Sequence, residues 1–202
     1  MARRVQQPRA YRKNVRAEHE AATRRRITEA TVALHREVGP ARTTISAVAE
    51  RAGVQRLTVY RHFPDEAALF GACSSHWLTA HPIPDPAPWA RVADPEERLR
   101  AALGALYEWY RGDEAMIANV GRDAPGIPAL AAIVANGLPA YLEAVHELLM
   151  PGWGARGRRR RMLSAALGHA LDFETWRSLE RRQGLEPENA IELMVRAVRA
   201  AF

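Results

Sequence analysis

One short segment of the chain concentrates side chains that donate hydrogen bonds to anions. Residues 56–62 read RLTVYRH, with two arginines, two hydroxyls and an imidazole but no acidic residue. Guanidinium groups bind phosphates and guanine edges, and hydroxyls donate to phosphate oxygens. Because a solvated helix face usually carries charges of both signs, this pattern favours a surface that contacts a negatively charged polymer.

Two short helices joined through residues 52–54 must position that segment. The oxygen of Thr44 can cap the first helix, in which apolar residues recur at helical spacing until Gly53. Glycine allows the tight backbone of the turn, and Val54 anchors the turn against apolar residues of both helices. The second helix ends at Pro64 and presents the donors outward. This is the pattern of a helix-turn-helix, whose second helix enters the major groove of DNA.

The runs TTISAVAERAGV (43–54) and TVYRHFP (58–64) resemble the DNA-binding domain of TetR-family transcriptional regulators, over about residues 20–73. The resemblance implies a homodimer that binds a palindromic double-stranded DNA operator, usually as a repressor, and releases it when a small-molecule effector binds. It also implies that Thr44, Tyr60 and His62 contact the DNA backbone, while Arg56 and Thr58 face the groove. The DNA-binding residues that we expect are Thr44, Gln55, Arg56, Leu57, Thr58, Tyr60, Arg61 and His62.

Three positions depart from the family pattern. Many relatives have serine where this chain has Gln55, and a small residue where it has Leu57. The third departure concerns a phosphate contact. Many relatives have a lysine near the start of the fourth helix, where it contacts phosphate, whereas this chain has Glu66. A carboxylate there would repel phosphate, although it suits the positive end of the helix dipole. We therefore expect no phosphate contact from this position, and arginines of the N-terminal arm could supply positive charge instead.

Charge is unevenly distributed along the chain, whose net charge is +6. Residues 1–63 contain 14 Arg or Lys against 5 Asp or Glu, whereas residues 64–202 contain 15 against 18. The basic first third is typical of a domain that binds a polyanion, and the alternative is a solvated basic tail. The candidate DNA-binding arm consists of Arg3, Arg4, Arg9, Arg12, Lys13 and Arg16.

Apolar residues recur at helical spacing along nearly the whole chain, so we expect an all-α fold. We expect a disordered basic arm over residues 1–16, a three-helix helix-turn-helix domain over 17–64, and a larger helical effector-binding and dimerisation domain over 65–202. The larger domain begins with a helix to about residue 80, followed by a non-helical linker at 81–95, where five prolines occur. Further helices are expected from Asp94 onward, over 125–149 with a kink at Pro139, over 158–183 and over 187–200.

The larger domain is rich in aromatic side chains mixed with polar groups, which is typical of a small-molecule pocket. The alternative for each aromatic residue is a place in the apolar core, and His169 and Asp172 could simply pair with each other. We expect the helix over 65–80 to couple this pocket to the DNA-binding domain. The candidate pocket residues are Trp109, Tyr110, Met116, Asn119, Tyr141, His169, Asp172, Phe173 and Trp176.

The last two predicted helices carry more apolar surface than one short domain needs. A palindromic DNA site requires two DNA-binding domains related by twofold symmetry, so we expect these helices to hold a homodimer together. The candidate interface residues are Ile191, Met194, Val195 and Val198.

Other functions lack their motifs in the sequence. A single cysteine excludes an internal disulfide framework, and His76 and His81 offer too few ligands for a metal. No nucleophile elbow or phosphate loop occurs, so we expect neither catalysis nor a cofactor. We find no secretory signal and no uninterrupted apolar segment of about 20 residues, so we expect a cytoplasmic protein without a membrane contact. The alternatives are a transcriptional activator of the same fold, an enzyme on a helical bundle, and a helical interaction protein that does not read DNA.

Overall fold

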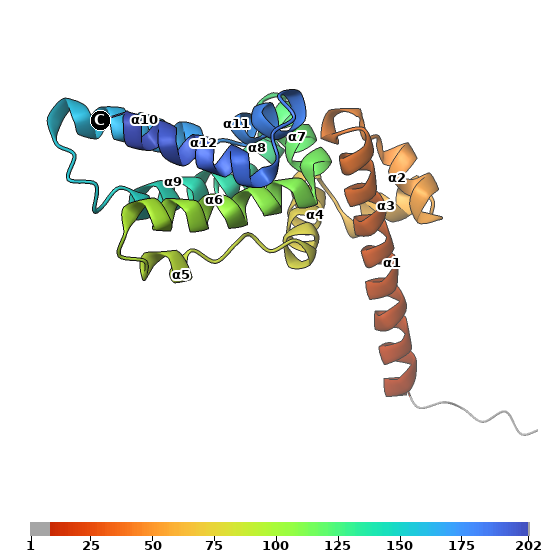
Figure 1. Ribbon diagram of the computed structural model, residues 1–202. Helices are drawn as coiled ribbons and strands as arrows, with labels where there is room; N and C mark the ends of the chain where they lie inside the picture. Colours follow the sequence, from red (N-terminus) through yellow and green to blue (C-terminus); the bar gives the residue numbers. More distant parts are fainter. Residues whose placement is uncertain (1–8, 202) are drawn as a thin grey trace, which may run out of the picture.

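Helices make up all the regular structure of residues 9–201, the part of the chain that the computed structural model describes. Side chains are described from Val15 onward. Strands are absent from this part of the chain, which confirms the all-α fold. Figure 1 shows the first helices grouped at one end of the molecule and the later helices in a longer bundle beside them.

The N-terminal group contains a long helix, a 3-10 turn and the two helices of the helix-turn-helix, and a further helix leads into the bundle. These elements are α1 (Arg9–Glu37), η1 (Pro40–Arg42), α2 (Ile45–Ala52), α3 (Arg56–His62) and α4 (Glu66–Ala80). The bundle consists of α5 (Ala87–Ala90), α6 (Pro95–Gly112), α7 (Glu114–Asp123), η2 (Ala124–Gly126), α8 (Pro128–Ala135), α9 (Leu138–Leu149), α10 (Gly157–Leu171), α11 (Phe173–Arg177), η3 (Ser178–Arg182) and α12 (Pro187–Ala200).

The turn between α2 and α3 has the geometry that the sequence predicts. The side-chain oxygen of Thr44 accepts a hydrogen bond from the Ala47 N–H at 3.1 Å and so caps α2. Gly53 ends α2 with a φ of 64°, in the left-handed region that favours glycine. Val59 of α3 is fully buried in a core shared with Ile27 of α1. The remaining buried residues of this core are Ala30, Val48, Ala49, Ala52, Phe63, Leu69 and Cys73.

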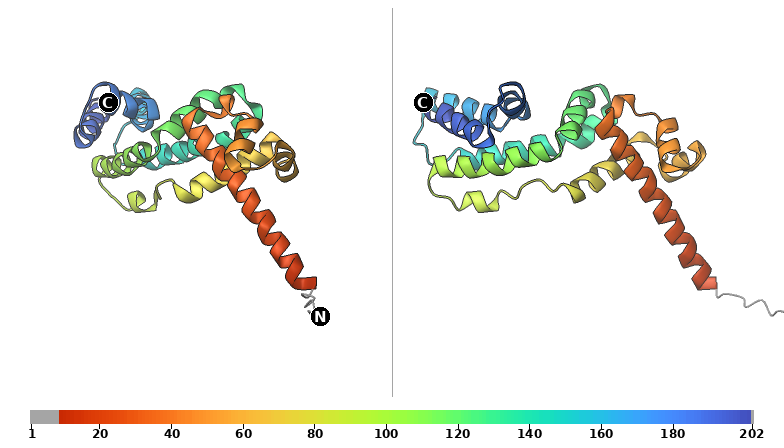
Figure 2. Two further views of the ribbon diagram at one scale, coloured as in Figure 1. Left: turned by 90° about the vertical axis from the view of Figure 1, so that its right-hand side faces the viewer. Right: turned by 45° about the vertical axis from the view of Figure 1, so that its right-hand side comes forward.

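Helix α1 begins at Arg9, whereas the sequence predicted a disordered arm up to residue 16 and a helix from about Ala17. No proline or glycine occurs between Pro8 and Gly39, and alanine, arginine and glutamate favour helix in this stretch. Residues 16–21 are all exposed, so no apolar stripe marks this part of the helix. Figure 2 shows the beginning of α1 extending away from the rest of the molecule. Intrinsic helix propensity, which apolar periodicity does not report, accounts for the difference.

The core of the bundle contains two buried tyrosines of α6 that bind the end of α10. Tyr107 and Tyr110 donate hydrogen bonds to the carbonyl oxygens of Ala170, at 2.8 Å, and Leu171, at 2.7 Å. These bonds satisfy carbonyl groups that a helix end leaves without partners. Burial raises the pKa of both phenols, so both hydroxyls remain protonated donors.

The residues predicted at a dimer interface are used inside the chain instead. Met194, Val195 and Val198 of α12 are buried in the bundle core, and Ile191 is half-buried against it. Three of these four side chains are therefore covered within the chain and not by a partner, because a helical stripe shows that a face is covered but not which element covers it. The interface role of Ile191 stays a prediction. The outer side of α12 carries Leu193, which is 44% exposed.

The stretch Pro128–Leu149 is long and apolar enough, by length and composition alone, to cross a membrane, which the sequence analysis did not expect. We also predicted one helix here, kinked at Pro139. The structure divides the stretch into α8 and α9, with the break at Asn136 and Gly137. Pro139 lies in the first turn of α9, where a proline removes no helical hydrogen bond.

Asp172 divides the helix predicted over residues 158–183. Its carboxylate accepts hydrogen bonds from the backbone N–H groups of Glu174, at 2.7 Å, and Thr175, at 3.2 Å. It therefore acts as the N-cap of α11 and ends the preceding helix. The predicted linker at 81–95 also differs, because one helical turn, α5, forms within it despite the prolines.

Two glycine substitutions test the geometry of the helix-turn-helix. We expect Gly53→Ala to lower the free energy of unfolding by about 1–2 kcal/mol, because alanine is strained in the left-handed conformation. Gly104→Ala, inside α6, should instead raise it by up to about 1 kcal/mol, since an added Cβ there meets open space. Urea denaturation followed by circular dichroism measures both changes, and equal changes in the two variants would contradict the turn geometry.

Candidate nucleic-acid interface and ligand cavity

The outer face of α3 is exposed and lacks acidic partners. Arg56 and Arg61 are exposed, and neither forms an ion pair with any described side chain. Between them lie two apolar side chains in contact with solvent, Leu57, which is 77% exposed, and Tyr60, which is 47% exposed. Free guanidinium groups beside exposed apolar groups can contact phosphates, base edges and thymine methyl groups.

The predicted contact residues at the helix starts border this face. Gln55 is exposed at the N-cap of α3, and its side chain makes no capping hydrogen bond. Thr44 is exposed at the N-cap of α2, where its oxygen acts as the capping acceptor and its O–H stays free to donate. Thr58 is half-buried. Gln55 and Thr44 therefore present polar side chains at helix N-termini, where backbone N–H groups attract anions.

The end of α3 is tied to α1. Arg24 donates from Nη1 to the carbonyl oxygen of His62 at 2.5 Å, and its guanidinium lies 4.1 Å from the centroid of the Phe63 ring. Partial burial, together with the charges of Arg61 and Arg24, lowers the pKa of His62. The Nε2 atom of His62 is buried without a partner among the described residues, so this nitrogen does not face outward.

The predicted basic arm is partly helical. Arg3 and Arg4 lie outside the described residues. The other predicted arm positions lie within α1, where Arg16 is exposed and 3.3 Å from Glu20. The described part of the arm is thus a helical extension, and its position relative to α2 and α3 is set by the core around Ile27.

A cavity of about 440 Å³ lies in the bundle, between α4 and the helices that follow it. We call it the bundle cavity. Among its lining residues the polar side chains are His35, Ser74 and Asp172, and no lysine or arginine lines it. Burial lowers the pKa of His35 to about 4, against a smaller opposing effect of Asp123, so this imidazole is uncharged near neutral pH. The cavity therefore fits an apolar, uncharged molecule.

Some of the predicted pocket residues line this cavity and others form the layer behind it. Trp109, Met116, Asp172 and Phe173 are in its wall. Tyr110 and Trp176 are fully buried, with ring centroids 5.2 Å and 5.7 Å apart for the Tyr110–Phe173 and Tyr110–Trp176 pairs. These two residues support the wall and do not reach the cavity.

The remaining predicted pocket residues make other contacts. Tyr141 donates from its hydroxyl to the carbonyl oxygen of Pro84 at 2.9 Å, and Asn119 contacts α1. His169 is exposed, and its Nδ1 lies 3.1 Å from the hydroxyl oxygen of Thr175, so the expected pair with Asp172 does not form. The side chains of Tyr141, Asn119 and His169 are of types that suit a pocket, but none of them lines the bundle cavity.

Helix α4 supplies lining residues that the sequence analysis missed. Phe70, Cys73, Ser74 and Trp77 line the cavity and follow the i, i+3, i+4, i+7 spacing of one helix face. That spacing is the signal that could have found them. Burial raises the pKa of the Cys73 thiol to about 12, so it acts as a small apolar group.

Asp113 connects the cavity wall with the DNA-binding domain. Its buried carboxylate accepts a hydrogen bond from the indole N–H of Trp77 at 2.6 Å. The same carboxylate lies 2.9 Å from Nε of Arg36, at the end of α1. Trp77 also packs edge-on against Trp109, with ring centroids 5.6 Å apart. A ligand that moves Trp77 would therefore disturb an ion pair to α1.

Helix α7 holds the end of α1 directly. The side-chain amide of Asn119 donates to the carbonyl oxygens of His35, at 3.1 Å, and Arg36, at 2.9 Å. The carboxylate of Asp123 accepts from the Ala41 N–H at 3.0 Å. Gly39, with a φ of 92°, allows this approach, because a Cβ there would collide with the side chains of Arg122 and Asp123. We call this set of contacts the α1–α7 junction.

Comparison with known proteins identifies the family that the helix-turn-helix region matches. Residues 27–73 match the family model "Bacterial regulatory proteins, tetR family". No curated protein matches the chain.

Several solved structures share the fold. A TetR-like transcriptional regulator from Rhodococcus sp. RHA1 is 17% identical, with a TM-score of 0.62 and coverage of 96% of both chains. A Clostridium perfringens protein named as a regulator of fatty acid metabolism is 18% identical, with a TM-score of 0.63 and coverage of 88% of this chain and 98% of that chain. The fatty acid degradation regulator FadR from Bacillus halodurans is 17% identical, with a TM-score of 0.56 and coverage of 89% and 96%. The chain has a TetR-like fold, with an N-terminal helix-turn-helix domain and a larger helical domain.

Substitutions on the face of α3 should separate positioning of DNA from reading of its sequence. We expect Tyr60→Phe and Thr44→Ala to weaken binding to all DNA sequences alike, because both hydroxyls are assigned to phosphates. Arg56→Ala and Leu57→Ala should change preference at particular base pairs, by about 1–3 kcal/mol for a lost bidentate guanine contact. Binding to a library of DNA sites measures both effects.

Two matched variants serve as controls for this experiment. Arg51→Ala removes an arginine that already pairs with Glu37 at 2.7 Å and should leave the preference unchanged. Thr44→Ser keeps both the cap and the hydroxyl. Equal responses at every base position to Arg56→Ala and Leu57→Ala would contradict the assignment.

Proposed function

We propose that this chain, a TetR-family transcriptional regulator by its DNA-binding domain and fold, acts as a homodimeric repressor in the cytoplasm. Its two α3 helices enter successive major grooves of a palindromic operator, and a small molecule in the bundle cavity releases the protein from DNA. One observation carries the proposal: α7 lines the bundle cavity and also forms hydrogen bonds with the end of α1.

Helices α7 and α1 connect the bundle cavity to the core beneath α3. Met116, Ile117 and Val120 of α7 line the cavity, and Asn119 on the same helix holds the carbonyl groups at the end of α1. An occupant that shifts α7 moves α1, whose Ile27 lies in the core beneath α3. An effector acts only if it binds two conformations with different affinities, and coupling of about 1–3 kcal/mol weakens DNA binding about 5- to 150-fold.

The sequence predicts this coupling through the fourth helix, and the contacts support two routes. Helix α4 supplies Trp77, which binds the Asp113 carboxylate that pairs with Arg36. Helix α7 supplies Asn119 and Asp123. Both routes converge on the last turn of α1 and the segment after it.

The chemistry of the lining supports an uncharged apolar effector. An anion in the bundle cavity would meet no cation to offset its desolvation, since His35 is uncharged and no lysine or arginine lines the wall. Asp172 would repel an anion and is already engaged as the cap of α11. The side chains of Trp77, Trp109 and Phe173 suit a ring system or an aliphatic chain.

The outer face of α10 and α12 is the proposed dimer interface. Among the described side chains the exposed large apolar residues are Leu57, Tyr60, Met162 and Leu193. The first two lie on the DNA face of α3, whereas Met162 of α10 and Leu193 of α12 lie on the bundle. Figure 1 shows α10 and α12 side by side at the end of the molecule away from α3. Pairing these faces would cover the second pair and leave both α3 helices free.

The coupling is tested with Asn119→Ala. We expect 1-decanol to lower the affinity of the wild-type protein for an inverted repeat beside its own gene about 5- to 150-fold. The variant should still bind decanol, measured by displacement of the uncharged dye Nile red, but its DNA affinity should respond much less. The physical reason is the loss of both hydrogen bonds from α7 to α1.

Two controls accompany this measurement. Asn136→Ala removes an asparagine whose amide bonds only within its own helix region, to the Ala132 carbonyl at 3.2 Å, and should respond like the wild type. Decanoate has the same chain with a negative charge and should not displace the dye. If the DNA affinity of Asn119→Ala responds to decanol like that of the wild type, the proposed coupling is wrong. If decanoate displaces the dye, the proposed effector class is wrong.

The dimer interface is tested with Leu193→Arg. A charge at the centre of an apolar interface is costly to bury, so we expect the variant to be monomeric at micromolar concentration in light scattering. Binding to the inverted repeat should weaken in parallel. Ala90→Arg, an exposed position on α5 away from α10 and α12, is the matched control and should remain dimeric. A dimeric Leu193→Arg protein would contradict the assignment of the dimer interface to α10 and α12.

A further inference from the structure

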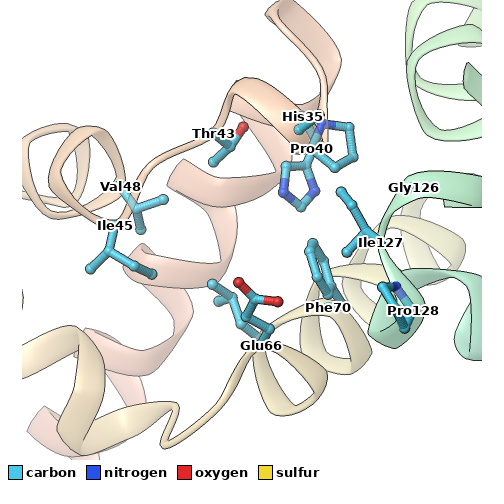
Figure 3. Close-up of a pocket in the computed structure, with 12 residues that line it drawn as sticks. His35, Pro40, Thr43, Ile45, Val48, Glu66, Phe70, Gly126, Ile127 and Pro128 are labelled. Carbon is cyan, nitrogen blue, oxygen red and sulfur yellow. The ribbon is translucent and has the colours of Figure 1, made fainter. Parts of the chain in front are cut away.

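A second cavity, of about 380 Å³, lies between the helix-turn-helix domain and the bundle. Its walls come from α1, η1 and α2 on one side, and from α4, η2 and the start of α8 on the other. Figure 3 shows His35, Pro40, Phe70 and Ile127 around the same space. We call it the junction cavity, because it lies where the two domains meet.

His35 is the unusual group in this cavity. The residue is only 4% exposed, yet neither ring nitrogen has a hydrogen-bond partner within the described part of the chain. Figure 3 shows its imidazole ring pointing into the space between Pro40 and Phe70. Neither ring nitrogen is among the fully buried polar atoms that lack a partner in the described residues, so both are accessible from the cavity and can bind a polar occupant.

The polar groups of the junction cavity are mainly acceptors. The hydroxyl of Thr43 already donates to the Gly39 carbonyl at 2.9 Å, which leaves its oxygen lone pairs available. Glu66 adds an exposed carboxylate at the wall. His35 is neutral near pH 7 and therefore offers one accepting nitrogen as well as one donor. No lysine or arginine is among the lining residues, so an anion would meet only the Glu66 charge.

We infer that the junction cavity is a second small-molecule site, separate from the effector site, and that it binds a small aromatic compound carrying an O–H or N–H donor and no negative charge. The ring of the ligand would lie against Phe70 and Ile127 and its donor would reach His35. Because the walls belong to both domains, an occupant adds contacts between them, beside the α1–α7 junction, and favours the arrangement of the domains described here.

The two cavities share part of their walls. His35 and Phe70 line both of them, with ring centroids 5.6 Å apart. Substitution of either residue would therefore affect both sites. Two glycines each line only one of the cavities and therefore distinguish them. Gly126 lines the junction cavity and Gly121 lines the bundle cavity, and a Cβ added at either one meets open space.

The probe for the test is 4-fluorophenol, which, like the tyrosine side chain, ionises only near pH 10 and is neutral at pH 7. Its ¹⁹F resonance should broaden on addition of the full-length protein. We expect 4-fluoroanisole, in which a methyl group replaces the donated proton, to bind about three- to tenfold more weakly, as one lost hydrogen bond predicts. We expect 4-fluorobenzoate, which is anionic, not to bind.

Replacing Gly126 or Gly121 with leucine shows which of the two cavities binds 4-fluorophenol. Gly126→Leu should abolish binding of 4-fluorophenol and its stabilising effect on the melting temperature, whereas Gly121→Leu should retain both. Loss of binding in Gly121→Leu alone, equal binding of phenol and anisole, or no binding to the wild type would each overturn the inference. None of these measurements needs DNA or an effector, so their outcome is independent of the proposed repression.

Discussion

The contact between α7 and the end of α1 is the constraint on which the arrangement of the molecule depends. A helix ends with carbonyl groups that lack internal partners, and here a side chain from the other domain binds two carbonyl groups of the last turn, of which that of His35 also accepts from the Gly39 N–H at 3.0 Å. Asn119 donates to the carbonyl oxygens of His35 and Arg36, and Arg36 in turn pairs with the buried Asp113. The end of α1 cannot move without losing these bonds, and this makes the position of the DNA-binding domain sensitive to the bundle.

Both cavities border the elements that make this contact. The bundle cavity is bounded by α7, which supplies Asn119, and by Trp77, which binds Asp113. The junction cavity is bounded by the segment after α1, where Ala41 bonds to Asp123. His35 and Phe70 separate them. A molecule in the first cavity would strain the contact, whereas a molecule in the second would add to it, so the two sites would act in opposite directions on the same structural element.

Exposed apolar groups mark the two surfaces at which the chain would meet other molecules. Burial of large apolar side chains is favourable, so their exposure in a soluble domain is informative when they occur together. Leu57 and Tyr60 stand beside unpaired arginines on α3, which suits a charged partner with apolar patches, such as DNA. Met162 and Leu193 are the exposed large apolar residues of α10 and α12, and Figure 1 shows these two helices at the other end of the molecule.

The sequence by itself determined the local structures whose causes lie within a few residues. The capping oxygen of Thr44, the glycine at position 53 and the donors of α3 all act within one or two helical turns, and the turn geometry followed from them. The start of α1 was missed because helix propensity without an apolar face leaves no periodic signal. What only the tertiary structure decided is which helix covers which apolar stripe. The stripe with Met194 faces its own bundle, and Asn119 turns to α1 and away from the cavity, because such choices depend on packing between segments far apart in the chain.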